Sequence, residues 1–93
     1  MNKSYQPLAV AAAHVGASEQ TLLEFFEAGW INVVSKDGRQ FVAGQDEYRS
    51  RFILHLRRKL SLTDEQIGIV LEHGKPPYSL AEVPAILARY SHA

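Results

Sequence analysis

The sequence contains no cysteine and no long apolar run. Without cysteine the chain has no disulfide, thiol nucleophile or thiolate metal ligand, which fits a reducing compartment. The longest uncharged apolar run, residues 8–15, is far shorter than the roughly 20 residues that a membrane helix needs. A polar segment follows this alanine-rich stretch, so we expect no secretory signal, no membrane crossing and a cytoplasmic protein.

The residues that usually carry catalysis or bind metals lack the necessary spacing. No two of the four histidines form a His-x-x-x-His pair, the spacing that places two ligands on one helix face. They are His14, His55, His73 and His92. No Ser-His-Asp order, glycine-rich phosphate loop or convincing carboxylate pair is present, and 93 residues leave little room for a deep pocket. We therefore expect a non-enzymatic protein with no catalytic residue, no metal and no cofactor.

The chain has a formal net charge of zero, but its two halves carry net charges of opposite sign. Residues 1–47 carry three basic and six acidic side chains, a net charge of −3, whereas residues 48–93 carry seven basic and four acidic, a net charge of +3. Nucleic-acid binders usually have a strong positive excess, because phosphate neutralisation supplies most of their affinity. This chain has no such excess.

Length and composition indicate one small globular domain. Hydrophobic residues make up 46% and charged residues 22%, as in ordinary globular proteins, and a chain this short rarely supports two cores. We expect a single domain over residues 1–93, with a core at 8–72 and a C-terminal extension at 76–93. The fold class expected is mainly α with a small β-hairpin and four to five short helices.

Capping residues and apolar spacing predict two helices in the first part of the chain. The first spans residues 8–15, with Pro7 suited to its first turn and Gly16 to a left-handed cap. The second spans residues 19–28, after Ser18 as the N-cap. Gly29 closes it, and one buried stripe is expected from Leu22, Phe25 and Phe26.

A β-hairpin is predicted next. Residues 30–34 and 40–42 are rich in β-branched and aromatic side chains, and Asp37-Gly38 between them supplies the positive φ values of a tight turn. The expected product is a two-stranded wing. Three aromatic residues are expected in the core: Trp30, Phe41 and Phe52.

Three more helical segments follow the hairpin. Residues 46–60 are expected to form a helix with one apolar side, made by Phe52, Ile53, Leu56 and Leu60. Arg51 and Arg58 are expected on the opposite side. Thr63 and Gln66 form a predicted capping box for a helix that buries Ile67, Val70 and Leu71 and ends at Gly74. Ser79 and Glu82 suggest another box, but Pro84 interrupts that segment, so its helix is expected to begin near Pro84.

Residues 8–27 fit a helix-turn-helix template. Ala12 stands where the helices approach closely, Gly16 at the turn, and Leu22 and Phe25 hold the second helix. Because a hairpin and two amphipathic helices follow, the chain resembles the MerR-like winged-helix superfamily over about residues 8–72. The resemblance rests on residues 22–31, on the wing-like residues 37–41, and on residues 56–62 with 67–71.

Within that superfamily the chain is most similar to the chaperone-modulator branch (the CbpM type). The similarity lies in the acidic second helix, the Leu-Arg-x-x-Leu-x-Leu run at residues 56–62, and Gly68-Ile69. DNA-binding relatives usually place a phosphate-holding arginine where this chain has Leu23. Both groups also tend to have a longer final helix, so a dimer through a long coiled coil is not expected.

The resemblance implies a protein that binds the J-domain of a DnaJ-like co-chaperone. The residues expected to carry this binding are Glu19, Gln20, Leu23, Glu24 and Glu27. The alternative is a transcriptional regulator that binds double-stranded DNA through Ser18, Gln20, Arg39, Arg51 and Arg58. Against the alternative, the glutamates of the second helix would oppose phosphates.

Several interpretations stay open. The acidic helix face could be merely solvated, and the arginines of the third helix could pair with Asp46, Glu47 or Glu72. The chain could also be an adaptor whose wing and last helix dimerise, so both monomer and homodimer are retained. Residues 76–93 could pack on the body or reach a partner.

Overall fold

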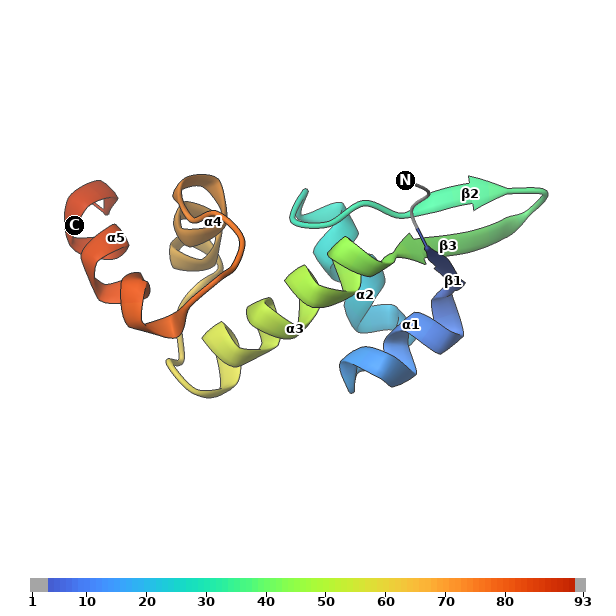
Figure 1. The fold of residues 1–93 in the computed structure, drawn as a ribbon, viewed down its shortest axis with the longest axis horizontal. Coiled ribbons are helices and arrows are strands. Elements are labelled where there is room, and N and C mark those ends of the chain that lie inside the picture. The colour runs from blue at the N-terminus through green and yellow to red at the C-terminus, as the bar shows by residue number, and fades with distance from the viewer. Residues whose placement is uncertain (1–3, 92–93) are drawn as a thin grey trace. The chain divides into compact units, whose positions relative to one another are not determined.

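The computed structural model describes residues 4–91, which are mainly helical (Figure 1). These residues contain five α-helices, one short 3₁₀ helix and a small three-stranded antiparallel sheet. In chain order the elements are β1 (Tyr5–Pro7), α1 (Leu8–Val15), α2 (Glu19–Glu27), β2 (Val34–Lys36), β3 (Arg39–Ala43), α3 (Gly44–Arg58), α4 (Asp64–His73), η1 (Leu80–Glu82) and α5 (Val83–Tyr90). The chain divides into two compact units, Met1–Arg51 and Phe52–Ala93.

The first helix pair forms as its caps predict. Gly16, with φ 84°, ends α1, and its N–H donates to the Ala12 carbonyl at 2.9 Å. Ser18 then caps α2, because its hydroxyl accepts the Thr21 N–H at 3.1 Å. Pro7 differs from expectation: it lies directly before α1, at the end of β1, and not in the first turn of the helix.

The buried stripe of α2 is narrower than predicted. Leu22 and Phe25 are fully buried, and the Phe25 ring packs against that of Trp30 at 5.8 Å. Phe26, however, is 40% exposed, so its assignment to the core was wrong. Since each helical residue turns by about 100°, the step from Phe25 to Phe26 leads away from the buried side.

The predicted hairpin is confirmed around its turn. Asp37 and Gly38, with φ 52° and 74°, connect β2 to β3 in a two-residue turn of the kind that matches strand twist. The first strand begins at Val34 and not at residue 30. The residues before Val34 do not join the sheet. One of them, Asn32, instead bonds to α3, because its N–H donates to Oδ1 of Asp46 at 3.1 Å.

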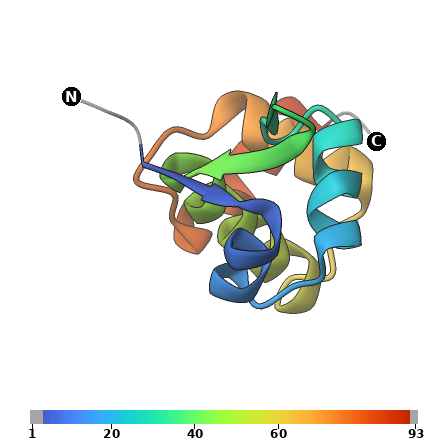
Figure 2. The ribbon, with the colours of Figure 1, turned by 90° about the vertical axis from the view of Figure 1, so that its right-hand side faces the viewer.

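The sheet has a third strand that the sequence analysis missed. β1 pairs antiparallel with β3, joining Tyr5 to Ala43 and Pro7 to Phe41, so the strand order is β1-β3-β2 (Figure 2). Three residues that end in proline are too short to show strand alternation, which explains the omission. Phe41 is only half-buried, whereas Trp30 and Phe52 are buried as predicted.

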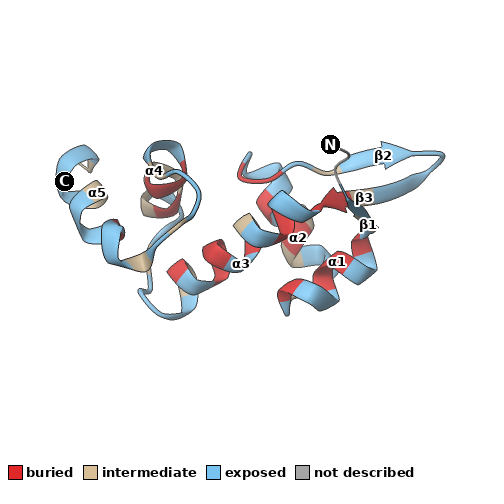
Figure 3. Cartoon of the chain, in the orientation of Figure 1, coloured by how far each residue is buried: buried red, intermediate tan, exposed pale blue. Residues whose placement is uncertain are grey.

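Helix α3 starts two residues earlier than expected and ends at Arg58. Its first part buries three polar residues in the first unit, namely Asp46, Glu47 and Ser50, and its later part buries Phe52, Ile53, Leu54 and Leu56 (Figure 3). Leu60 lies beyond the helix end and is 39% exposed, so its predicted place on the apolar side was wrong.

The second unit contains the predicted capping box. The Thr63 hydroxyl accepts the Gln66 N–H at 3.2 Å, and the Gln66 side chain accepts the Thr63 N–H at 2.9 Å. The three predicted apolar residues of α4 are buried: Ile67, Val70 and Leu71. Gly74 follows the helix as expected, and its N–H donates to the Val70 carbonyl.

Residues 76–91 pack within the second unit. The helix α5 begins at Val83, which is fully buried, has Pro84 in its first turn, and lies against α4. The Ser79 hydroxyl accepts the Ala81 N–H at 3.2 Å, so a 3₁₀ turn replaces the predicted box with Glu82. Two ring stacks complete the unit, Phe52 on Tyr78 at 4.7 Å and His73 on Tyr90 at 3.5 Å.

Candidate functional site

The predicted partner-binding residues lie together on the solvent side of α2. Four of them are exposed and one, Leu23, is half-buried; the exposed residues are Glu19, Gln20, Glu24 and Glu27. They share a side because Leu22 and Phe25 turn the opposite side of the helix into the core. We call Glu19, Gln20, Leu23, Glu24, Phe26 and Glu27 the α2 face.

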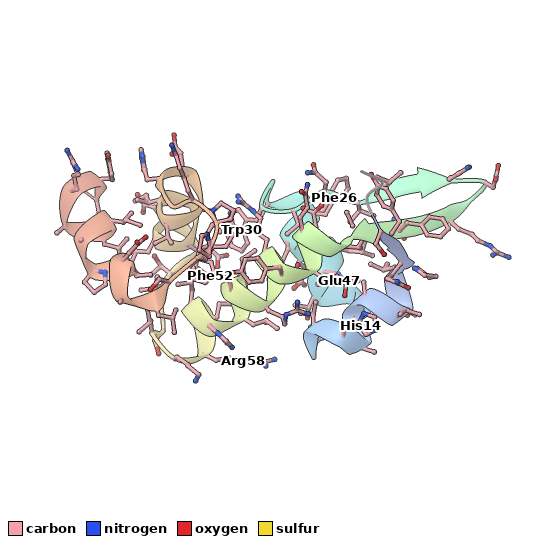
Figure 4. The ribbon with its side chains drawn as sticks, viewed as in Figure 1. His14, Phe26, Trp30, Glu47, Phe52 and Arg58 are labelled. Atoms are coloured by element: carbon pink, nitrogen blue, oxygen red, sulfur yellow. The ribbon has the colours of Figure 1, made fainter. Side chains whose placement is uncertain are left out.

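Phe26 is the member of this face that sequence reasoning missed. It follows Leu23 by three residues, a spacing that makes neighbours on a helix surface. Phe26 is 40% exposed, and Figure 4 labels its side chain on α2. The α2 face therefore has an apolar pair with carboxylates around it. Phe26 lies only about 40° around the helix from the buried Leu22, so its exposure could not be read from helical spacing alone.

The carboxylates of the α2 face are uncompensated. Within residues 4–91 no ion pair or hydrogen bond involves the side chains of Glu19, Glu24 or Glu27. Glu24 and Glu27 occupy the last turn of α2, which has no basic residue, and negative charge at a helix C-terminus opposes the helix dipole. The two are also three residues apart, a spacing at which like charges repel. Their placement therefore does not serve the stability of the helix.

Two other carboxylates of the first unit are unavailable for surface recognition. Asp46 is 5% exposed and accepts the Asn32 N–H. The Glu47 side chain, 8% exposed, accepts a hydrogen bond from Nδ1 of His14 at 2.8 Å, which links α3 to α1 (Figure 4). The accessible negative charge of this unit therefore lies on α2 and at the turn residue Asp37.

One arginine of α3 has an acidic partner that the sequence analysis did not name. Asp46 and Glu47 are engaged as described, and Glu72 lies 3.9 Å from His73. Arg57, near the end of α3, pairs with Asp64 at the start of α4 at 3.3 Å. Both acidic residues in the first turn of α3, Asp46 and Glu47, are buried in the first unit.

The residues proposed for DNA binding are scattered over several elements. Ser18 is used as the cap of α2, Gln20 lies on the α2 face, and Arg39 is exposed at the start of β3. Arg51 and Arg58 are on α3, but Arg58 belongs to the second unit. The first unit thus contains two of the three arginines named for DNA binding, Arg39 and Arg51.

No protein-family model, curated protein or solved structure matches this chain. Its function is therefore inferred from its own residues. In the part that the structure describes, no group of three or more His, Asp or Glu side chains is placed to hold a metal ion. None of the helices described combines the length and apolar character that a bilayer crossing requires.

Proposed function

We propose that this chain is a winged helix-turn-helix protein of the MerR-like type that works by binding another protein. The order of elements supports the fold assignment: a helix pair turns at Gly16, a hairpin follows, and two further helices come after it. The short turn at Asp37-Gly38 supports a wing. The role proposed is that of a chaperone modulator.

The proposed partner is the J-domain of a DnaJ-like co-chaperone, bound through a basic surface. One observation carries this proposal: three unpaired carboxylates surround Leu23 and Phe26 on the α2 face. Charged rims steer a partner of opposite sign, and a small apolar centre supplies the desolvated contact. A basic protein surface fits both features.

Calorimetric titration of each J-domain of the host into the full chain tests the proposal. We expect binding that Glu24→Lys with Glu27→Lys weakens about tenfold or more. The matched control is Glu72→Lys with Glu82→Lys, which makes the same change in net charge on exposed residues of the second unit and is expected to leave binding nearly unchanged. No binding to any J-domain would overturn the partner, and equal loss in both variants would overturn the role of the α2 face.

Double-stranded DNA is the second candidate partner, and Arg39 favours it. Within residues 4–91 this exposed arginine has no ion pair, so it is available for a phosphate. A regulator would bind an operator with an affinity that falls steeply as salt rises. We expect no gel shift with genomic fragments; a salt-sensitive shift that Arg39→Ala abolishes would establish the regulator instead.

A further inference from the structure

A second surface of the first unit is exposed, apolar and positively charged. Residues paired directly across strands share a face of the sheet, as do alternate residues along a strand. The register therefore places one set of side chains on the same face: Tyr5, Pro7, Val34, Lys36, Arg39, Phe41 and Ala43. Val42, on the opposite face, is fully buried, so the set containing Tyr5 forms the outer sheet face.

The outer sheet face exposes apolar side chains, whereas the solvated face of an antiparallel sheet usually carries polar ones. Tyr5 is 45% and Val34 43% exposed, Phe41 is half-buried, and only Ala43, next to α3, is buried. A recess at the hairpin end is lined by Lys36, Asp37, Arg39 and Phe41. Contiguous exposed apolar side chains with polar residues at their rim are typical of interaction surfaces.

The charged side chains of the outer sheet face do not stabilise the sheet. Lys36 and Arg39 stand directly opposite each other across the turn, a like-charge arrangement that destabilises a strand pair. Within residues 4–91 neither side chain has an ion pair or a hydrogen bond. The outer sheet face thus presents two positive charges without ion pairs next to an aromatic and aliphatic surface, with the single carboxylate of Asp37 at the turn beside them.

The α2 face has the complementary character. It presents Leu23 and Phe26 with three uncompensated carboxylates, where the sheet presents apolar side chains with two cations without ion pairs. Both surfaces belong to one compact unit, so they meet only when a second copy supplies one of them. We infer that the outer sheet face of one copy docks the α2 face of another copy.

This contact joins different surfaces on the two copies, a head-to-tail arrangement. The inferred self-docking rests on the proposed function in one respect, that the α2 face is a docking surface. When that face is occupied by a second copy, it is closed to a protein partner. Self-association therefore competes with partner binding. Dilution exposes the α2 face, and a tightly binding partner displaces the second copy from it.

Charge exchange between full-length variants tests the inference by sedimentation velocity. One variant carries Glu24→Lys and Glu27→Lys, and the other carries Lys36→Glu and Arg39→Glu. Each variant has two surfaces of the same sign, so each alone is expected to stay monomeric. An equimolar mixture restores complementary contacts and is expected to associate as the wild type does. Wild-type association is expected to weaken about tenfold or more between low and high salt.

The sheet variant keeps a like-charge cross-strand pair but places its two carboxylates beside Asp37, so circular dichroism of this variant is used to check that its hairpin folds. Val34→Thr is a second variant, and it leaves the charge of the sheet unchanged. We expect it to weaken association about threefold, because it removes exposed apolar surface. A wild type that stays monomeric up to about millimolar concentration, where even weak specific complexes form, overturns the inference. Failure of the mixture to associate also overturns it.

The two proposals fail separately. The Lys36→Glu, Arg39→Glu variant has an unchanged α2 face, so it is expected to bind a J-domain at least as well as the wild type. J-domain binding by a wild type that never self-associates overturns the self-docking alone. Self-association without binding to any J-domain overturns the proposed partner alone.

Discussion

Two side-chain contacts stabilise the helices of the first unit. Ser18 caps α2, and the His14–Glu47 hydrogen bond connects α1 to α3. The first is local and can be read from sequence, because a serine before a glutamate-led apolar segment is a common N-cap pattern. The second joins residues 33 apart in sequence and needs the fold to bring them together.

Loss of the α2 cap is expected to destabilise the fold measurably. Ser18→Ala removes the acceptor for the Thr21 N–H, and we expect the free energy of unfolding to fall by about 1 kcal/mol. Urea denaturation followed by circular dichroism measures the change. Ser18→Asp, which retains an acceptor, is the control, and equal losses in both variants would contradict the capping role.

The His14–Glu47 contact is expected to show energetic coupling. Glu47 is buried, so removal of its partner leaves a carboxylate without that hydrogen bond. A double-mutant cycle with His14→Ala and Glu47→Ala is expected to give a coupling energy of about 1 kcal/mol, moderated because His14 is half exposed. Additive effects of the two substitutions would show that the contact contributes nothing.

At the scale of elements, the hairpin depends on its turn. Gly38 has φ 74°, a conformation that costs a residue with a β-carbon roughly 1–2 kcal/mol. We therefore expect Gly38→Ala to lower the free energy of unfolding by about 1 kcal/mol. Gly44→Ala is the matched control, since Gly44 begins α3 and an added β-carbon there meets only the Ser4 carbonyl at 3.9 Å. A larger loss for Gly44→Ala would contradict this explanation.

Local signals predicted the helices well and the sheet only in part. Gly16, Ser18 and the Thr63–Gln66 box act within a few residues, so their chemistry is visible in the sequence. β1 was missed because it exists only through its pairing with β3. The outer sheet face could not be predicted without that register.

The candidate site was predicted in its charges and missed in its apolar centre. The glutamates of the α2 face follow from helical spacing, whereas the exposure of Phe26 depends on which side of the helix the core occupies. Likewise Asp46 and Glu47 counted as surface acids in the sequence but are buried in the fold. The acidic character of the first half is therefore concentrated on α2.

At the scale of the whole molecule, a net charge of zero conceals surfaces of opposite sign. The α2 face is acidic and the outer sheet face is basic, and neither arrangement stabilises its own element. We propose that intermolecular contacts account for these charges, which cost local stability and lack partners within the described residues. This is the common basis of the proposed function and of the self-docking.

The most direct test of the central claim is the salt dependence of J-domain binding, measured by calorimetry for the wild type and the Glu24→Lys, Glu27→Lys variant. If the α2 face is the binding surface, the wild type binds more tightly by about tenfold at low salt, and added salt narrows that difference. Equal affinities for the two proteins at low salt would contradict the claim.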